Sequence, residues 1–338
     1  MTRTTPPRPA DLEAAFPELA SLARTATRLH PRPGIPSPQD SSIGGPLLWP
    51  ASEPWPHCGE VAHHTSPIPL MSVADARLRQ RLAAARDSRA AARPSREGWG
   101  YNPYTPEERA ILEQIQAQDK PEGPVSMLPV AQLYLRDVPG LRPPEGSDLL
   151  QVLWCPFEHD DGMPTTALFW RTAAAVSDIL LAPPEPAAIY GVFYVPEPCL
   201  VHPEEVIEYP SALELGKEMR ERLERWAVTE FGIEYLDLCI PPGCKVGGYI
   251  NWGMTDAYPT PCPTCGTPTE PLLTISGKEW YFDVHHWIPY EDQADNLAWG
   301  PGQDGPARPT RICVSDDNAQ IIQICPASPE HPHTQIMQ

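Results

Sequence analysis

The spacing of apolar positions predicts a chain with more short strands than helices. Short apolar or alternating runs recur between residues 127 and 324, and most are bounded by proline, glycine or charged residues. Strands and helices do not alternate regularly, so we predict an α+β fold with mainly antiparallel sheets rather than a doubly wound sheet. The predicted strands are 127–135, 149–154, 167–170, 188–195, 201–209, 234–239, 272–275, 311–314 and 320–324.

Four segments have the period or the start of a helix. Apolar residues recur at helical spacing over 11–29, where Asp11 can cap the first turn and Pro17 can bend or break the helix. Thr105 and Glu108 have the spacing of a capping box. The predicted helices are 11–29, 74–93, 105–118 and a segment that begins at 211, and the second and third form a helical insertion at 71–120.

Two pairs of segments repeat within the chain. Residues 43–56 and 246–259 share a Gly-Gly pair, a tryptophan four residues after it and a later aromatic-proline pair. Residues 149–156 (Leu-Leu-Gln-Val-Leu-Trp-Cys-Pro) resemble residues 321–326 (Ile-Ile-Gln-Ile-Cys-Pro). Internal repetition of this kind predicts two related lobes built on a common framework. The predicted lobes are residues 1–210, with the helical insertion, and residues 211–338.

The chain is acidic and rich in proline. Its 44 acidic and 25 basic residues give a net charge of −19, which repels the phosphates of nucleic acids and favours a basic protein partner. Its 46 prolines predict short elements and long connections, because proline disrupts helix interiors and central strands.

Neither a membrane span nor a secretory signal is evident. No run approaches the roughly 18 apolar residues of a membrane helix, and the first residues lack the apolar segment of a signal peptide. We therefore predict a cytoplasmic protein without membrane contact. Its nine cysteines are expected to be reduced, buried or metal-bound rather than paired in disulfides.

The strongest chemical motif is Cys262-Pro-Thr-Cys265-Gly, which is typical of a zinc knuckle. The segment that contains Cys325 and His331 offers the other two ligands. If strands 272–275 and 320–324 pair antiparallel, the start of one lies beside the end of the other, and the two halves of the site meet at one sheet edge. We predict a closed structural zinc site, with His333 as a competing fourth ligand.

The first lobe has a looser counterpart of this motif. Cys58 follows the first Gly-Gly segment, and Cys155 follows the strand that corresponds to 320–324. With His63 and His159 they form a second candidate metal site. Unpaired core cysteines and exposed histidines are the alternative interpretation of these four residues.

Two further hypotheses compete with a purely structural role. In the first, the protein is a metal-dependent enzyme, such as a hydrolase, that uses the first-lobe cluster with an open coordination position. The cluster then includes His57, Cys58, His63, His64, Cys155 and His159. In the second, the protein binds a small ligand or peptide on the aromatic side chains of the Gly-Gly segments, which requires Trp49 or Trp252 to be partly exposed.

Motifs of common enzyme classes are missing. The sequence has no phosphate-binding glycine loop, dinucleotide fingerprint, HExxH or nucleophile elbow. His285 and His286, beside Asp283, are the remaining acid/base candidates, and adjacent residues of a strand face opposite sides. We therefore assign no catalytic residue, and the sequence favours a non-enzymatic protein.

Several ordered blocks resemble the YwqG-like bacterial proteins, a family of unknown function. Ser42-Ile-Gly-Gly-Pro46, followed by Glu-Pro-Trp-Pro56, is similar to the family's opening motif, and 127–135, 146–154 and Lys245-Val-Gly-Gly248 are similar to later blocks. The resemblance implies a double-lobed α+β fold and, because such proteins occur near toxin systems, an immunity or partner-binding role. The insertion and the extra cysteines and histidines indicate a subgroup.

Overall fold

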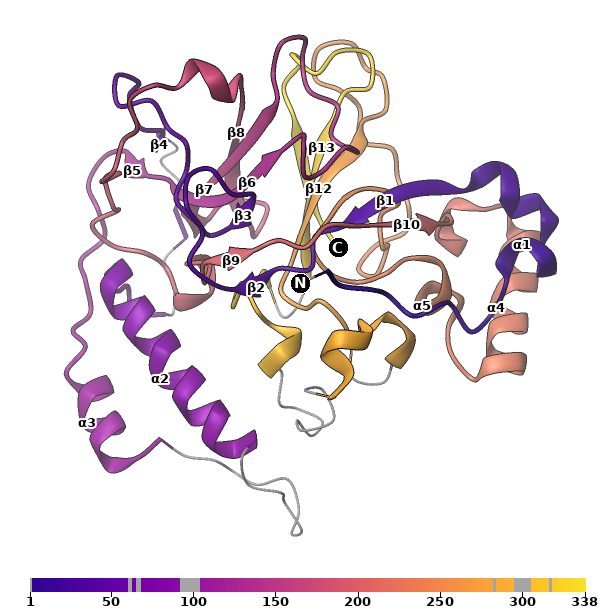
Figure 1. Ribbon diagram of the computed structural model, residues 1–338, viewed down its shortest axis with the longest axis horizontal. Coiled ribbons are helices and arrows are strands. Elements are labelled where there is room, and N and C mark those ends of the chain that lie inside the picture. The colour runs from indigo at the N-terminus through magenta and orange to yellow at the C-terminus, as the bar shows by residue number, and fades with distance from the viewer. Residues whose placement is uncertain are drawn as a thin grey trace.

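Among the described residues, two six-stranded antiparallel sheets lie at the centre of the computed structural model (Figure 1). The structure describes residues 2–59, 63–64, 68–91, 104–281, 284–294, 305–315 and 318–338. Sheet A contains, in spatial order, β10 (Glu204–Glu208), β1 (Arg24–Arg28), β11 (Lys245–Gly247), β12 (Glu270–Ser276), β13 (Ala319–Ile324) and β14 (Thr334–Met337). Sheet B contains β2 (Arg32–Pro33), β9 (Cys199–Leu200), β3 (Ser42–Ile43), β6 (Leu128–Tyr134), β7 (Leu149–Glu158) and β8 (Pro164–Arg171).

Helices lie at both ends of this pair of sheets, which confirms the predicted α+β class (Figure 1). The α-helices are α1 (Leu12–Ala15), α2 (Val73–Ala91), α3 (Pro106–Glu113), α4 (Lys217–Phe231) and α5 (Tyr235–Cys239). The 3₁₀ helices are Pro17–Leu22, Ala173–Ala175, Val192–Tyr194, Ala212–Glu214, His285–Trp287, Tyr290–Asp292 and Gly305–Ala307. Within the residues that the structure describes, no helix has the length and apolar character needed to cross a bilayer.

The insertion at 71–120 contains α2 and α3, which lie apart from α4 and α5 (Figure 1). The side chain of Gln80 fastens α2 to the body by donating to the carbonyls of Val192 and Val195, at 3.1 and 2.6 Å. Arg89 on α2 forms a two-point ion pair with Glu108 on α3. Residues 92–103, which include the end of the predicted helix 74–93, lie outside the described residues.

The register of the strands matches the two sequence repeats residue by residue. Ile43 of β3 pairs with Ala131, and Val246 of β11 pairs with Leu273, so the two Gly-Gly pairs lie at the ends of equivalent strands. Both following strands also have an irregularity at the same place, between Pro129 and Ala131 in β6 and between Pro271 and Leu273 in β12. The six strands of one sheet therefore correspond in order to the six strands of the other.

Each repeat contributes its first strand to the other repeat's sheet. β1 joins sheet A, whereas the strands that follow it, β2 and β3, join sheet B; β9 joins sheet B, whereas β10 and β11 join sheet A. The crossovers are Leu29-His30-Pro31 and Val201-His202-Pro203, and they touch where the His202 amide donates to the Leu29 carbonyl at 2.7 Å. Sheet A thus takes strands from both sides of residue 210, and the division into lobes 1–210 and 211–338 stays a prediction.

The predicted helix 11–29 is wrong in its second half. Asp11 accepts from the Ala14 amide at 3.0 Å and caps α1, and Pro17 begins a 3₁₀ helix, as expected. Arg24–Arg28 is instead strand β1, hydrogen-bonded to β10 on one side and β11 on the other. Pairing along both edges outweighs the local helical spacing.

Other predicted boundaries also differ from the structure. The predicted strand 234–239 is helix α5, because Glu234 and Asp237 form a capping box that starts a helix. Segments 188–195 and 311–314 are not strands: the first contains a 3₁₀ helix, and in the second Arg311 has a φ of 53°. The helix after Thr105 has the predicted capping box but ends at Glu113 instead of 118.

A buried ion pair lies beneath the second Gly-Gly segment. The Lys245 ammonium donates to both Glu208 carboxylate oxygens at 2.6 and 2.8 Å, and these two side chains are 3% and 0% exposed. Glu208 also accepts from the Tyr249 amide at 2.7 Å. Gly248 has a φ of 73°, and a side chain there would overlap the Glu208 carboxylate and lie 2.7 Å from the Ala26 methyl. The glycine is therefore needed for packing at this position.

Gly248→Ala should lower the free energy of unfolding by about 2–4 kcal/mol, since it adds overpacking to an unfavourable backbone conformation. Gly232→Ala is the matched control, because Gly232 has a φ of 70° but open space where the methyl group would be. It should cost only about 1 kcal/mol. Urea denaturation measures both variants, and equal losses would contradict the packing explanation.

Candidate metal centres

Cys262, Cys265, Cys325 and His331 come together as predicted, with their ligand atoms all within 4.8 Å of one another. The Cys262 sulfur lies 3.5 Å from His331 Nδ1, and the Cys265 sulfur lies 3.5 Å from the Cys325 sulfur. These four side chains provide three sulfurs and one imidazole at a single point.

The turn between Cys262 and Cys265 brings both sulfurs to one side. The Cys262 amide donates to the Thr267 carbonyl at 2.8 Å, and the Gly266 amide donates back to the Cys262 carbonyl at 2.9 Å. Gly266 has a φ of 73°, which glycine adopts without strain. The Thr264 amide points at the Cys262 sulfur, at 3.4 Å. These bonds form a knuckle that holds two ligands before β12 begins.

Strand pairing supplies the other half of the site. Glu270 at the start of β12 pairs with Ile324 at the end of β13, so Cys325 emerges beside the knuckle, as the antiparallel prediction required. His331 lies in the turn between β13 and β14. His333, the competing ligand, lies elsewhere, with its Nε2 3.0 Å from the Thr166 hydroxyl.

Cys58, His63, Cys155 and His159 also meet, again with all ligand atoms within 4.8 Å. The Cys155 sulfur lies 3.4 Å from His63 Nε2, and the Cys58 sulfur lies 3.7 Å from His159 Nε2. Cys58 belongs to β4 (His57–Cys58), which pairs with β5 (Val125–Ser126) and is fixed by that pairing. The His63 ring stacks on Phe157.

The two groups occupy equivalent places in the two repeats. In each, two ligands lie in the connection between the Gly-Gly strand and the next strand of the sheet. The third ligand is a cysteine directly after Trp154 or Ile324, two residues that pair with Leu128 and Glu270 at equivalent positions. The fourth ligand is a histidine in the turn that follows. We call these groups the first set (Cys58, His63, Cys155, His159) and the second set (Cys262, Cys265, Cys325, His331).

The two sets differ in exposure. All four residues of the first set are buried, whereas Cys265 of the second set is exposed and His331 is partly exposed. Hydrogen bonds from the Thr267 hydroxyl and amide, with a smaller contribution from Cys325, lower the pKa of the Cys265 thiol to about 6. This thiol is therefore disposed to be the thiolate that a metal ion requires.

The remaining histidine and tryptophan candidates belong to neither set. His57 lies between the Trp55 carbonyl and the Ser126 hydroxyl, at 2.8 and 3.1 Å, and exposed His64 lies 3.3 Å from Asp160. His286 is 2.8 Å from the Asp237 carbonyl, and its predicted neighbour Asp283 lies outside the described residues. Trp49 and Trp252 are only 1% and 5% exposed, which removes the basis for ligand binding on their faces.

By fold and by site, the chain is an antiparallel α+β protein with two equivalent Cys/His four-residue groups. Comparison with protein-family models and with curated proteins found no match. The similarity to the YwqG-like proteins therefore stays a prediction.

The difference in exposure predicts that Cys265 of the second set is alkylated before the cysteines of the first set. In the native protein, a small alkylating reagent should modify Cys265 well before Cys58 or Cys155, because only the Cys265 side chain of these three is exposed. Timed alkylation followed by peptide mass spectrometry measures the order. Urea should equalise the three rates, and equal rates in the folded protein would contradict the burial described for the first set.

Proposed function

We propose that both sets bind zinc as a structural ion, in a non-enzymatic protein that acts by binding a partner. The observation that carries the proposal is the occurrence of four converging ligands at equivalent places in both repeats. Two sulfurs with two imidazoles, and three sulfurs with one imidazole, are donor sets typical of structural zinc.

A closed ligand set supports a structural rather than a catalytic role. Four protein ligands complete a tetrahedral shell, whereas catalytic zinc keeps a position for water. Burial of all four first-set residues argues against the open position that the hydrolase hypothesis required. Each zinc would supply a rigid junction between the connection that follows the Gly-Gly strand and the turn that precedes the last strand of the same sheet.

Charge supports a basic partner. The net charge of −19 attracts a cationic protein and speeds its encounter, and this attraction weakens as salt is added. A cationic toxin domain fits this chemistry. Thiolate ligands also require a reducing compartment, and we propose the cytoplasm.

Metal analysis tests the zinc proposal. Elemental analysis of the purified chain should find two zinc ions per chain, with one remaining in Cys265→Ser and one in Cys155→Ser. The double variant should hold none, and Cys313→Ser, which changes a cysteine of neither set, should keep both. A chain without metal after purification and zinc reconstitution would overturn the proposal.

A salt series tests the partner proposal. Immobilised protein should retain a specific basic protein from the native cell extract at low salt and release it as the salt rises. An unrelated protein of equal size and net charge measures non-specific retention. Retention that does not depend on salt, or turnover of a metabolite without any specific partner, would reverse this assignment.

A further inference from the structure

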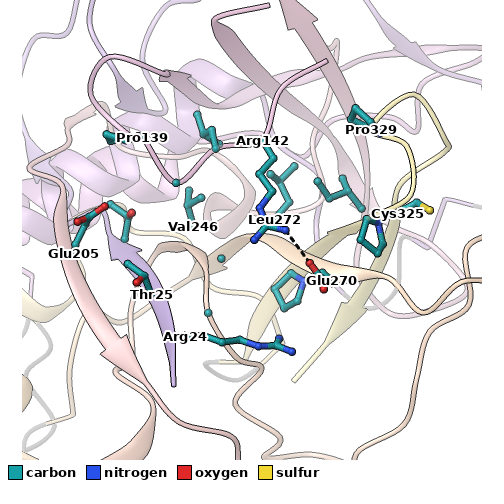
Figure 2. A pocket seen from close by; sticks show the side chains of 18 residues that line it. Arg24, Thr25, Pro139, Arg142, Glu205, Val246, Glu270, Leu272, Cys325 and Pro329 are labelled. Atoms are coloured by element: carbon teal, nitrogen blue, oxygen red, sulfur yellow. Dashed lines mark hydrogen bonds and ion pairs between the residues drawn. The ribbon is translucent and has the colours of Figure 1, made fainter. Parts of the chain in front are cut away.

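One cavity of about 590 Å³ lies on sheet A, under a connection from the other sheet (Figure 2). Its floor and sides come from β1, β10, β11 and β12, and its cover is the segment Pro139–Arg142, which follows β6 of sheet B. Cys325 and Pro329 form a third side. The size is within the range of small-ligand sites.

The cavity exists because the two repeats differ at this point. The strand registers make Thr27, Val246 and Ile324 of sheet A equivalent to Cys199, Ile43 and Trp154 of sheet B. On sheet B the equivalent face is filled. The Trp154 indole packs edge-on against Tyr194, and the Cys199 thiol lies 3.4 Å from the Pro309 carbonyl.

The connections that lie over the two equivalent sheet faces also differ in extent. The face of sheet B is closed by residues of the long connection between β12 and β13, where the Glu197 amide donates to the Thr310 carbonyl at 2.8 Å. The corresponding connection between β6 and β7 is much shorter, and it covers the face of sheet A only in part. A hydrophobic core in one repeat thus corresponds to an open cavity in the other.

Polar side chains also line the cavity at positions where sheet B has apolar ones. Thr27 stands where sheet B has Cys199, and Glu270 stands where it has Leu128. A space left only by imperfect packing would keep an apolar lining. Polar side chains at these equivalent positions instead favour a hydrated or polar occupant.

The two sides of the cavity carry opposite net charge. Figure 2 shows Glu205 and Thr25 on one side, and Arg142, Arg24 and Glu270, which together carry one net positive charge, on the other. Arg142 is 78% exposed, and its ion pair with Glu270, at 3.2 Å, is open to solvent. Exposed pairs of this kind are weak, so the guanidinium can exchange this carboxylate for one from a ligand. Partly exposed Gly247 lies between the two ends, with the nearly covered side chains of Val246 and Leu272 beside it.

We infer that this cavity binds a short peptide of two or three residues with both termini free. The peptide amine would lie at Glu205 and Thr25, its carboxylate at Arg142, and its backbone over Gly247. A carboxylate at one end and a net positive charge at the other match the order of charges in such a zwitterion. This inference goes beyond the proposed metal sites, because none of its three contacts is a metal ligand.

NMR titration of the full-length, zinc-replete protein with tri-alanine tests the inference. Saturable shifts in the millimolar range are expected at amides that line the cavity. N-acetyl tri-alanine and tri-alanine amide should each bind about tenfold more weakly, since each lacks one charged end. Absence of saturable shifts up to about ten millimolar, or equal affinity for free and capped forms, would overturn the inference.

Two variants locate the ends of the peptide. Glu205→Gln should weaken the binding of free tri-alanine, and N-acetylation should then cause no further loss of affinity. Arg142→Gln should likewise weaken the binding of free tri-alanine, and C-terminal amidation should then cause no further loss. Arg136→Gln is the control, because Arg136 is exposed in the same connection but does not line the cavity. Equal effects of all three variants would assign the binding to general charge and refute the site. Zinc content, measured on the same samples, reports separately on the metal sites.

Discussion

Cys155→Ser should lose one zinc per chain and at least about 5 kcal/mol of stability, so that its soluble yield falls, while the folded fraction that can be purified keeps one zinc. Cys155 is fully buried within β7, with its sulfur 3.4 Å from His63 Nε2. Structural zinc contributes roughly 10–16 kcal/mol of apparent binding free energy in small domains, which equals or exceeds the stability of a typical protein.

Cys199→Ser provides the matched control for this prediction. Cys199 is equally buried and lies in the same sheet, but it belongs to neither set. Its substitution should cost at most about 1–3 kcal/mol, because the buried hydroxyl group can still donate to the Pro309 carbonyl, and should leave two zinc ions bound. Zinc content and urea unfolding measure both variants. Equal stability losses with unchanged zinc would show that Cys155 is only a core residue.

Lys245→Met should lower the free energy of unfolding by about 3–5 kcal/mol, because it leaves the Glu208 carboxylate buried without its cation. The methionine keeps most of the apolar volume of the lysine, so the loss reports on charge rather than on a cavity. Urea denaturation at neutral pH measures the effect.

The double variant Lys245→Met/Glu208→Gln distinguishes this electrostatic cause from general damage. The neutral amide can still accept from the Tyr249 amide, which bonds Glu208 in the native protein. Most of the lost stability should therefore return, since removing both charges of a buried pair is far less costly than removing one. A double variant that is no more stable than Lys245→Met would refute the explanation.

The sequence predicted both four-residue groups because local patterns marked them. A knuckle with cysteines three residues apart, and a Cys-Pro pair just after a strand, are features of single segments, and antiparallel pairing then brings the segments together. For Cys58, which is far from Cys155 in the chain, the repeated order of segments pointed to the first set, but no local pattern fixed the two cysteines side by side.

Other features depend on partners that local patterns do not specify. Arg24–Arg28 has the spacing of a helix, and only its pairing with β10 and β11 makes it a strand. The cavity on sheet A arises because the β6–β7 connection covers less of its sheet than the β12–β13 connection does, and no single segment of the sequence reveals this difference. One signal was available, however: Leu-His-Pro at 29–31 and Val-His-Pro at 201–203 repeat like the Gly-Gly segments and mark the crossovers.

The reciprocal exchange of β1 and β9 has a consequence for biosynthesis. As the nascent chain leaves the ribosome, β1 has no strand to pair with until β10 and β11 have been translated, and sheet B lacks β9 until all the strands of the first repeat have been translated. Such distant pairing slows folding. The first set, however, is entirely encoded before residue 160, so a zinc ion captured there could hold the early half of the polypeptide together while the ribosome finishes the rest.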